Sequence, residues 1–313
     1  MFTEYIMSVV NALLDAVAAL LFTLVTSLFG VVKLFIPSSY FFKDIKGDIV
    51  LVTGGGSGIG RLMCCKFAKK GAIVVTWDIN SKGNDETVAM IKKDGGKAYS
   101  YIVDISNREE IYSTAEKMKK EVGSPDILVN NAGIVSGSNI LDTPDSKIIK
   151  TFEVNTFAHF WTIKAFLPEM IKAKKGHVVN IASLAGHSGT NKLVDYCASK
   201  FAAVGLDEAF RVELFVQGHS EYIKTTVVCP YYISTGMFAG VQSKLVPILE
   251  PEFVAEKAVS GVLSNEEVIL LPSWTFLLIT LKAILPSSGF MRLGQAFGFN
   301  CSMDQFQGRQ KQQ

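Results

Sequence analysis

The most reactive combination in this sequence is a tyrosine and a lysine four residues apart. Tyr196 and Lys200 belong to the sequence YCASK, and residues at i and i+4 of a helix lie on one face, one turn apart. A phenol has an unperturbed pKa near ~10, so it needs a neighbouring cation to release its proton at neutral pH. Lys200 would supply that charge, and Tyr196 would act as a general acid or base. The alternative is an ordinary half-exposed helical pair, because this spacing also arises by chance.

Two upstream residues fit the same chemistry. Ser183 follows the apolar run VVNIA and would hydrogen-bond a substrate oxygen, whereas Asn155 in FEVNTF would hold a water molecule that carries protons away. An alcohol that loses a proton to Tyr196 and a hydride to an acceptor develops negative charge on oxygen, which Ser183 and Tyr196 would stabilise. The sequence has no CxxC pair and no two histidines at helical spacing, so we predict no metal site.

A glycine-rich segment predicts a nucleotide site. TGGGSGIG directly follows the apolar run IVLVT and precedes a helical pattern. Gly54, Gly58 and Gly60 would let the backbone turn tightly and approach a pyrophosphate at the positive end of the next helix. Ser57 and Ile59 complete this loop.

The acidic residues that end the next two strands indicate which dinucleotide fits. Asp78 lies 18 residues beyond Gly60, where a carboxylate accepts hydrogen bonds from the ribose 2′-hydroxyl and repels a 2′-phosphate. This favours NAD over NADP, although Arg61 and Lys82 are near enough in the sequence to offer the opposite charge. The alternative for Asp78 is a turn residue that caps the next helix. Asp104 would meet the adenine, or is an ordinary loop aspartate.

These residues need a scaffold that brings strand ends together, and the sequence pattern supplies one. Short β-branched runs alternate with longer helical stretches after Gly47, which is typical of a doubly wound α/β fold with a parallel, seven-stranded Rossmann sheet covered on both faces. The predicted strands are 49–53, 73–77, 99–103, 127–130, 178–182, 225–229 and 268–271. We predict an anchor and linker over 1–47, a catalytic domain over 48–272 and an apolar segment with a polar tail over 273–313.

The N-terminal segment predicts a hydrophobic membrane helix. Residues 16–32 carry no charge over about 25 Å of helix, and the run reaches the ~30 Å of a bilayer core if it extends to Ile36. Asn11 and Asp15 mark its expected upstream limit. A cleaved signal peptide fits less well because residues 1–15 hold no lysine or arginine, and a buried core helix is the remaining alternative. Lysines follow the segment, which favours a cytosolic catalytic domain.

A second apolar stretch and the overall composition complete this outline. Residues 268–281 are uncharged and too short to span a bilayer, so we expect either the last strand followed by a core or dimer helix, or a membrane-surface or pocket-lid role. The 31 basic and 29 acidic residues are scattered, which argues against a nucleic-acid partner. Hydrophobic residues make up 49% of the chain, which excludes global disorder. Five cysteines without a disulfide pattern favour a reducing compartment.

The order and spacing of these motifs resemble the short-chain dehydrogenase/reductase family from about Ile49 to Leu271. The resemblance implies that Tyr196 is the acid/base, that Lys200 lowers its pKa and binds the nicotinamide ribose, that Ser183 orients the substrate oxygen and that Asn155 completes a proton relay. The motif NNAG would brace the sheet beside the cofactor. The cofactor residues carried over are Gly54, Ser57, Gly58, Ile59, Gly60, Asp78, Asp104, Asn131, Ala132, Gly133, Tyr196, Lys200, Pro230, Ile233 and Thr235. One departure is Tyr231, where many relatives have glycine.

A narrower resemblance is carried by WDIN, KKEVG, NNAGIVSG, KAFLP, DYCASKFAA, IKTTVVCP, TGMF and PILEP. These segments are similar to membrane-anchored retinol dehydrogenases of the epidermal type and to 17β-hydroxysteroid dehydrogenases. The resemblance implies oxidation of all-trans-retinol to retinal with NAD, at the endoplasmic reticulum or lipid droplets, by a homodimer. Another lipid alcohol and a non-catalytic lipid-droplet scaffold remain the alternatives. The apolar set Tyr231, Tyr232, Met237 and Phe238 suits a lipid substrate or ordinary core packing.

Overall fold

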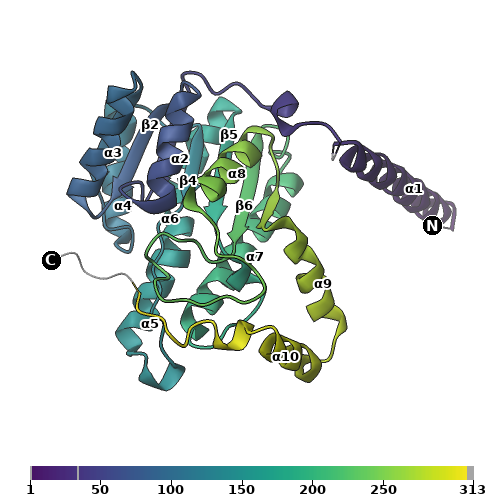
Figure 1. Ribbon diagram of the computed structural model, residues 1–313. Coiled ribbons are helices and arrows are strands. Elements are labelled where there is room, and N and C mark those ends of the chain that lie inside the picture. The colour runs from purple at the N-terminus through teal and green to yellow at the C-terminus, as the bar shows by residue number, and fades with distance from the viewer. Residues whose placement is uncertain (1, 34, 309–313) are drawn as a thin grey trace. The chain divides into compact units, whose positions relative to one another are not determined.

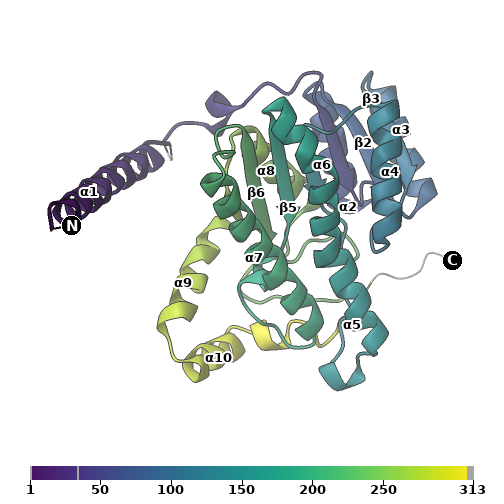
Figure 2. The same ribbon diagram turned by 180° about the vertical axis from the view of Figure 1, so that it is seen from behind.

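The computed structural model describes residues 2–33 and 35–308 of the chain. The chain divides into two compact units, Met1–Phe42 and Lys43–Gln313. The first unit holds α1 (Phe2–Lys33) and a short 3-10 turn over Ser38–Phe41. The second unit holds the sheet and the other helices (Figures 1 and 2).

The N-terminal helix is longer than the sequence suggested. Residues Glu4–Val32 of α1 form a continuous apolar helix of 29 residues, long enough to cross a membrane. Its large apolar side chains, such as Leu20 and Phe22, are exposed within this unit. The expected upstream limit at Asn11 and Asp15 is therefore wrong, because single polar residues one turn apart weaken a helix without ending it.

The second unit contains a parallel sheet of seven strands in the order β3-β2-β1-β4-β5-β6-β7. The predicted doubly wound fold is thus confirmed, with each strand within two residues of its expected bounds. Every residue of β4 and β5 is buried, since these central strands are covered on both faces. The strands are β1 (Ile49–Thr53), β2 (Ile73–Asp78), β3 (Lys97–Ile102), β4 (Ile127–Asn130), β5 (Gly176–Ile181), β6 (Ile223–Pro230) and β7 (Val268–Leu271).

Helices form a layer on each face of the sheet. One layer is made by α2 (Gly58–Lys69), α3 (Ser81–Lys93) and α8 (Pro251–Leu263), in which α2 packs against both of its neighbours (Figure 1). The other layer is made by α4 (Arg108–Glu121), α6 (Ala158–Ala173) and α7 (Val194–Val216) (Figure 2). The short helix α5 (Asp145–Phe152) leads into α6 and packs against α7.

The strand order places a ligand site between β1 and β4. These strands are neighbours although β2 and β3 separate them in the sequence. The chain therefore leaves them toward opposite faces of the sheet, and ligands of doubly wound folds bind at the carboxyl ends of strands at such a point.

The C-terminal segment forms an arm beyond β7. It contains α9 (Phe276–Ile284), α10 (Ser287–Ala296) and a 3-10 turn over Phe299–Cys301. The arm runs past α7 and turns back below the carboxyl ends of the strands (Figures 1 and 2). Residues of the arm reach the loop after β6, because Ser302 O accepts a hydrogen bond from Gln242 N at 2.9 Å.

Candidate functional site

A cavity of about 1010 Å³ lies at the carboxyl ends of the strands. Its volume is at the upper end of the ~300–1,000 Å³ of small-molecule sites. All fifteen residues that the sequence assigned to cofactor binding line it, and so does Ser183. Of the four residues assigned to catalysis, Asn155 alone does not. The structure therefore brings the predicted residues to one place, while their individual roles stay predictions.

The backbone of the glycine loop follows a path that leaves no room for side chains. Gly54 has a φ of +68°, in the left-handed region that favours glycine. A Cβ on Gly60 would lie 2.1 Å from Gly54 O, so the first turn of α2 packs directly on the loop. This close packing leaves the loop and the start of α2 on the cavity wall, where backbone N–H groups bind phosphate in other nucleotide sites.

The NNAG segment is fastened to the end of β1. Thr53 Oγ1 accepts hydrogen bonds from Asn131 N at 2.9 Å and Ala132 N at 3.1 Å. In return, Asn131 Nδ2 donates to Thr53 O at 2.8 Å. These bonds fix two cavity-lining loops relative to each other, as the expected bracing role requires.

Asp78 lines the cavity as a turn residue at the end of β2, but it does not cap the next helix, because that cap is Asn80, whose Oδ1 accepts from Gly83 N at 3.0 Å. Asp78 Oδ2 accepts from Gly56 N and Asp78 Oδ1 accepts from Asn80 N, each at 2.9 Å, so the carboxylate organises both loops. Each of these carboxylate oxygens keeps a second lone pair. Arg61 is already occupied, because its Nη2 donates to Gly56 O at 2.6 Å and to Glu86 Oε2 at 2.9 Å.

Asp104 also lines the cavity and is held by cations and hydroxyls. Its Oδ1 accepts from Ser106 Oγ at 2.6 Å, and Lys150 Nζ lies 3.1 Å from Oδ2. Burial acts to raise the pKa of Asp104, but the hydrogen bonds from Ser106 and Lys150 outweigh it, so the net shift is downward. Lys150 lines the cavity too and was missed, because nothing in the sequence placed α5 beside the end of β3.

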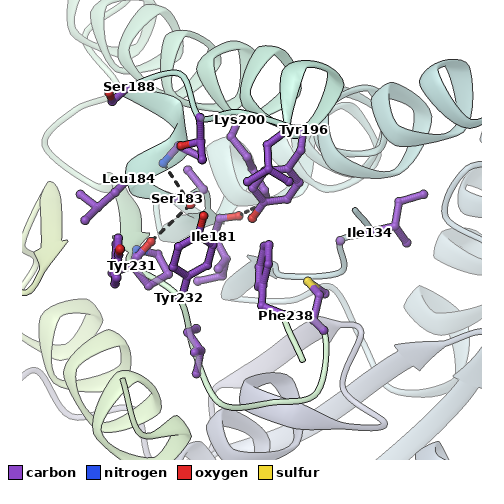
Figure 3. A pocket seen from close by; sticks show the side chains of 18 of the residues that line it. Ile134, Ile181, Ser183, Leu184, Ser188, Tyr196, Lys200, Tyr231, Tyr232 and Phe238 are labelled. Atoms are coloured by element: carbon purple, nitrogen blue, oxygen red, sulfur yellow. Dashed lines mark hydrogen bonds between the residues drawn. The ribbon is translucent and has the colours of Figure 1, made fainter. Parts of the chain in front are cut away.

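Tyr196, Lys200 and Ser183 point into the same space (Figure 3). Tyr196 and Lys200 lie one turn apart on α7 and are both buried. Lys200 Nζ donates to Ile181 O at 2.8 Å and lies 5.8 Å from the centroid of the Tyr196 ring. Ser183 comes from the loop after β5, and its Oγ donates to Pro230 O at 3.3 Å. The end of β5 and the helix α7 thus fix the positions of the three groups.

Burial is the main cause of the pKa shifts of Tyr196 and Lys200. It raises the pKa of Tyr196, while the hydrogen bond with Ser183 acts to lower it. Burial also lowers the pKa of Lys200 to about 8. The net direction for Tyr196 is opposite to the one that the sequence implied, because desolvation of a buried phenolate outweighs the groups that favour it. Ser183 is the neighbour that acts to lower the pKa of Tyr196, which is the direction that the sequence implied.

Asn155 lies behind the cavity wall, in a π-helical turn over Glu153–Phe157. Its Oδ1 accepts from Ile134 N at 2.8 Å, and its Nδ2 donates to Ile134 O at 2.9 Å and to Ser199 Oγ at 3.0 Å. The side chain is therefore occupied in joining the loop after β4 to α7. Such turns are frequent at functional sites, and these bonds give Asn155 a structural task beside its predicted role.

Aromatic rings line the cavity beside Tyr196. Phe238 meets the Tyr196 ring edge-on with centroids 5.6 Å apart, and it packs on Tyr232 at 5.1 Å (Figure 3). Tyr231, where many members of the resembled family have glycine, meets the Tyr232 ring edge-on with centroids 4.7 Å apart, and its hydroxyl bonds Ser243 Oγ at 2.9 Å. The departure from the family pattern is thus accommodated by aromatic packing.

The C-terminal arm contributes about a quarter of the residues that line the cavity, and the sequence assigned none of them to the site. Lys282 Nζ donates to His187 O at 2.6 Å, which ties α9 to the loop after β5. The uncharged run from Val268 was the one available signal, and it left a lid as one of two interpretations. The arm residues that line the cavity are Thr275, Leu278, Ile279, Leu281, Lys282, Ser287, Phe290, Met291, Leu293, Gly294, Phe297, Phe299 and Asn300.

The cavity thus has two walls. We use "nucleotide wall" for Gly54, Ser57–Gly60, Asp78, Asp104 and Asn131–Gly133. We use "substrate wall" for Tyr231, Tyr232, Phe238, α9 and α10. A Cβ on Gly133 of the nucleotide wall would lie 3.7 Å from Lys200 Nζ, and the Phe238 ring of the substrate wall meets Tyr196. Tyr196 and Lys200 therefore lie where the two walls meet, and Ser183 lines the same cavity.

Comparisons with known proteins agree with this geometry. The short chain dehydrogenase family matches residues 48–245. Epidermal retinol dehydrogenase 2 from Homo sapiens is 46% identical over 273 residues, 86% of this chain and 88% of that protein. Estradiol 17-beta-dehydrogenase 11 from Mus musculus is 47% identical over 274 residues, 88% of this chain and 91% of that protein. A short chain dehydrogenase/reductase from Burkholderia phymatum, solved in complex with NAD, has the same fold with a TM-score of 0.71 at 23% identity, covering 77% of this chain and 94% of that one. The chain belongs to the short-chain dehydrogenase/reductase family and is an oxidoreductase that acts on CH–OH groups.

Proposed function

We propose that this protein oxidises a lipid alcohol with NAD, and that its substrate is all-trans-retinol. One observation carries the proposal: the buried Tyr196 hydroxyl, with Ser183 and Lys200 beside it, faces the same cavity as the glycine loop and Asp78. A hydride acceptor and an acid/base group would therefore meet one substrate alcohol, the acceptor at its carbon and the acid/base group at its oxygen.

The nucleotide wall fits NAD. The glycine loop and the start of α2 would hold the pyrophosphate, and Asp78 would accept from the ribose hydroxyls. Arg61 would not offer its charge to a 2′-phosphate, because Gly56 O and Glu86 already occupy it. Bound NAD would supply the hydride acceptor.

The chain's own residues would handle the proton. Ser183 would donate a hydrogen bond to the substrate oxygen, and Tyr196 would take the proton from the alcohol. Lys200 carries a positive charge through most of the neutral range, since its pKa is about 8, and that charge would oppose the burial that disfavours the phenolate. Asn155 would hold the loop and α7 at the spacing that this transfer requires.

The substrate wall suits a long apolar alcohol. It is built from Tyr231, Tyr232 and Phe238 and from the apolar side chains of α9 and α10. Relatives named for retinol and for estradiol are nearly equally similar to this chain. A 17β-hydroxysteroid is therefore the second candidate, since both alcohols are largely apolar and carry the hydroxyl to be oxidised at one end of the molecule.

We further propose that α1 anchors the protein in the endoplasmic reticulum membrane or on lipid droplets, with the catalytic unit in the cytosol. A homodimer would form through α6 and α7. The exposed aromatic side chains Phe157, Phe160 and Phe201 support this arrangement, because they lie on these two helices or at the turn before α6.

Membranes containing the full chain would test the function. They would be incubated with NAD and either all-trans-retinol or estradiol, with matched membranes carrying Tyr196→Phe as the control. Retinal formation that depends on Tyr196 supports the proposal, and estrone formation alone moves it to the steroid. If NAD binds and neither product forms, the protein is a scaffold and the proposal fails.

A further inference from the structure

The arm after β7 is nearly uncharged, and yet its helix α9 has no fully buried residue. Of the residues from Val268 to Met303, only Lys282 and Arg292 are charged. Every residue of α9 is described, and none is fully buried. A helix that is apolar on all sides is normally covered by protein or by lipid.

The two sides of α9 have different surroundings. Leu278 and Ile279 line the cavity on the inner side. Leu277 and Ile284 do not line it, and they are 56% and 73% exposed. Met291 on α10 is 59% exposed and lines the cavity as well. A layer one helix thick therefore separates the cavity from an exposed apolar surface.

We infer that the outer surface of α9 and α10 docks on a phospholipid bilayer and that the apolar substrate reaches the cavity through it from the lipid. We use "docking surface" for Phe276, Leu277, Ile284, Met291 and Phe297, which are all more than 40% exposed. The statement about the substrate rests on the proposed function, whereas the docking itself does not.

Charge identifies lipid as the occupant. Between Glu267 and Asp304 the chain has no acidic residue, so no carboxylate on the arm would repel lipid phosphates. Arg292 is exposed on α10 beside the docking surface, where a guanidinium can pair with a phosphate. The same chain carries a helix long and apolar enough to cross a membrane, which would keep the arm close to a bilayer.

Contacts of the arm with the loop after β5 and with α7 hold the arm in a form suited to docking. Lys282 Nζ donates to His187 O at 2.6 Å and lies 5.1 Å from the centroid of the Phe201 ring, so this cation faces the protein. The outer side of α9 is left without charge. The arm thus turns its polar anchor inward and its aliphatic side chains outward, the reverse of an ordinary surface helix.

Site-directed fluorescence in vesicles would test the docking directly. The full chain, in a Cys301→Ser background, would carry an environment-sensitive dye on Leu277→Cys or Ile284→Cys. The matched control is Met90→Cys on α3, which is 46% exposed and lies toward the opposite edge of the sheet. Vesicles of phosphatidylcholine and phosphatidylserine would contain spin-labelled lipid as a quencher.

We expect strong quenching of the dye at both α9 positions and little at position 90. Equal quenching at all three positions, or none, would overturn the inference. A blue shift without quenching would also overturn it, because protein, such as a second copy of this chain, would then cover the surface. Quenching requires no turnover, so docking without retinol oxidation would leave the inference standing while the proposed function fails.

The route of the substrate has its own test. Leu277→Glu with Ile284→Glu keeps α1 and every cavity-lining residue, yet loses burial of two aliphatic side chains, so delivery of retinol from vesicles should fall by about tenfold or more. Turnover of a small water-soluble secondary alcohol should not change. Equal activities of the variant and the parent toward retinol in vesicles would show that the substrate does not enter through the docked arm.

Discussion

The nucleotide wall and the substrate wall are held together by different kinds of interaction. Hydrogen bonds between side chains and backbone position the nucleotide wall, as when the Thr53 hydroxyl accepts from Asn131 N and Ala132 N. Edge-on ring contacts and a returning arm position the substrate wall, as when Phe238 packs between Tyr196 and Tyr232. Hydrogen bonds fix distances closely, whereas apolar packing adapts when side chains change. The cofactor side can thus stay constant while the substrate side varies.

Removing the Tyr196 hydroxyl should impair catalysis and leave the binding of NAD and of the alcohol nearly unchanged. Tyr196→Phe deletes the proton acceptor and little packing, so kcat should fall by about 10²–10⁴-fold. Binding of NAD and of the alcohol should change little, since neither wall is altered. Steady-state turnover and NADH fluorescence titration measure the two effects. Activity within a few fold of the parent would remove Tyr196 from the chemistry.

The charge of Lys200 should appear as a pH dependence of stability. Burial lowers its pKa to about 8 from 10.5, so the penalty on the charged form is complete below pH 8 and disappears as the pH rises toward 10.5. In that window the unfolded chain binds more protons, and the free energy of unfolding rises with pH, by about 2–3 kcal/mol.

Lys200→Met provides the comparison, because it lacks this group and keeps all others. Denaturant unfolding of both detergent-solubilised proteins, followed by tryptophan fluorescence across pH 8 to 10.5, measures the difference. The parent should gain stability relative to the variant as the pH rises. Parallel curves would mean that Lys200 is solvated in the folded protein.

A change confined to the nucleotide wall should alter only cofactor discrimination. Asp78→Ala removes the carboxylate that repels a 2′-phosphate and would accept from the ribose, so the preference for NAD over NADP should narrow by about tenfold or more. The KM for the alcohol should not change. Asp85→Ala, on the exposed side of α3, is the matched control for loss of one charge. Unchanged discrimination would leave Asp78 with its structural hydrogen bonds alone.

The sequence predicted the nucleotide wall well because its signals are local. The glycine loop, Asp78 and NNAG each lie at the end of a strand, and parallel strands bring their ends together without further information. The pair Tyr196 and Lys200 follows from helical spacing in the same way. The direction of the Tyr196 pKa shift was not predictable, because burial depends on tertiary packing.

The part of the substrate wall that α9 and α10 form could not be predicted, for the opposite reason. Its residues lie up to about 100 positions away from Tyr196, and no spacing rule links them. Apolar composition identified the segment without saying which side of it would meet the cavity. The occupied side chain of Asn155 was likewise hidden, since its partner Ile134 lies in a loop.

The smallest expected effect belongs to the substrate wall. Phe238→Leu removes the edge-on contact with Tyr196 and the packing on Tyr232, while an aliphatic side chain still fills part of the space. Aromatic pairs contribute about 0.5–1.5 kcal/mol beyond their buried area, so the KM for retinol should rise by about 2–10-fold. The KM for NAD should stay the same, because Phe238 contacts no residue of the nucleotide wall through these rings. Phe253→Leu on α8, which does not line the cavity, is the control. If both KM values rise together, the two walls are coupled through Tyr196 and do not act as separate parts of the site.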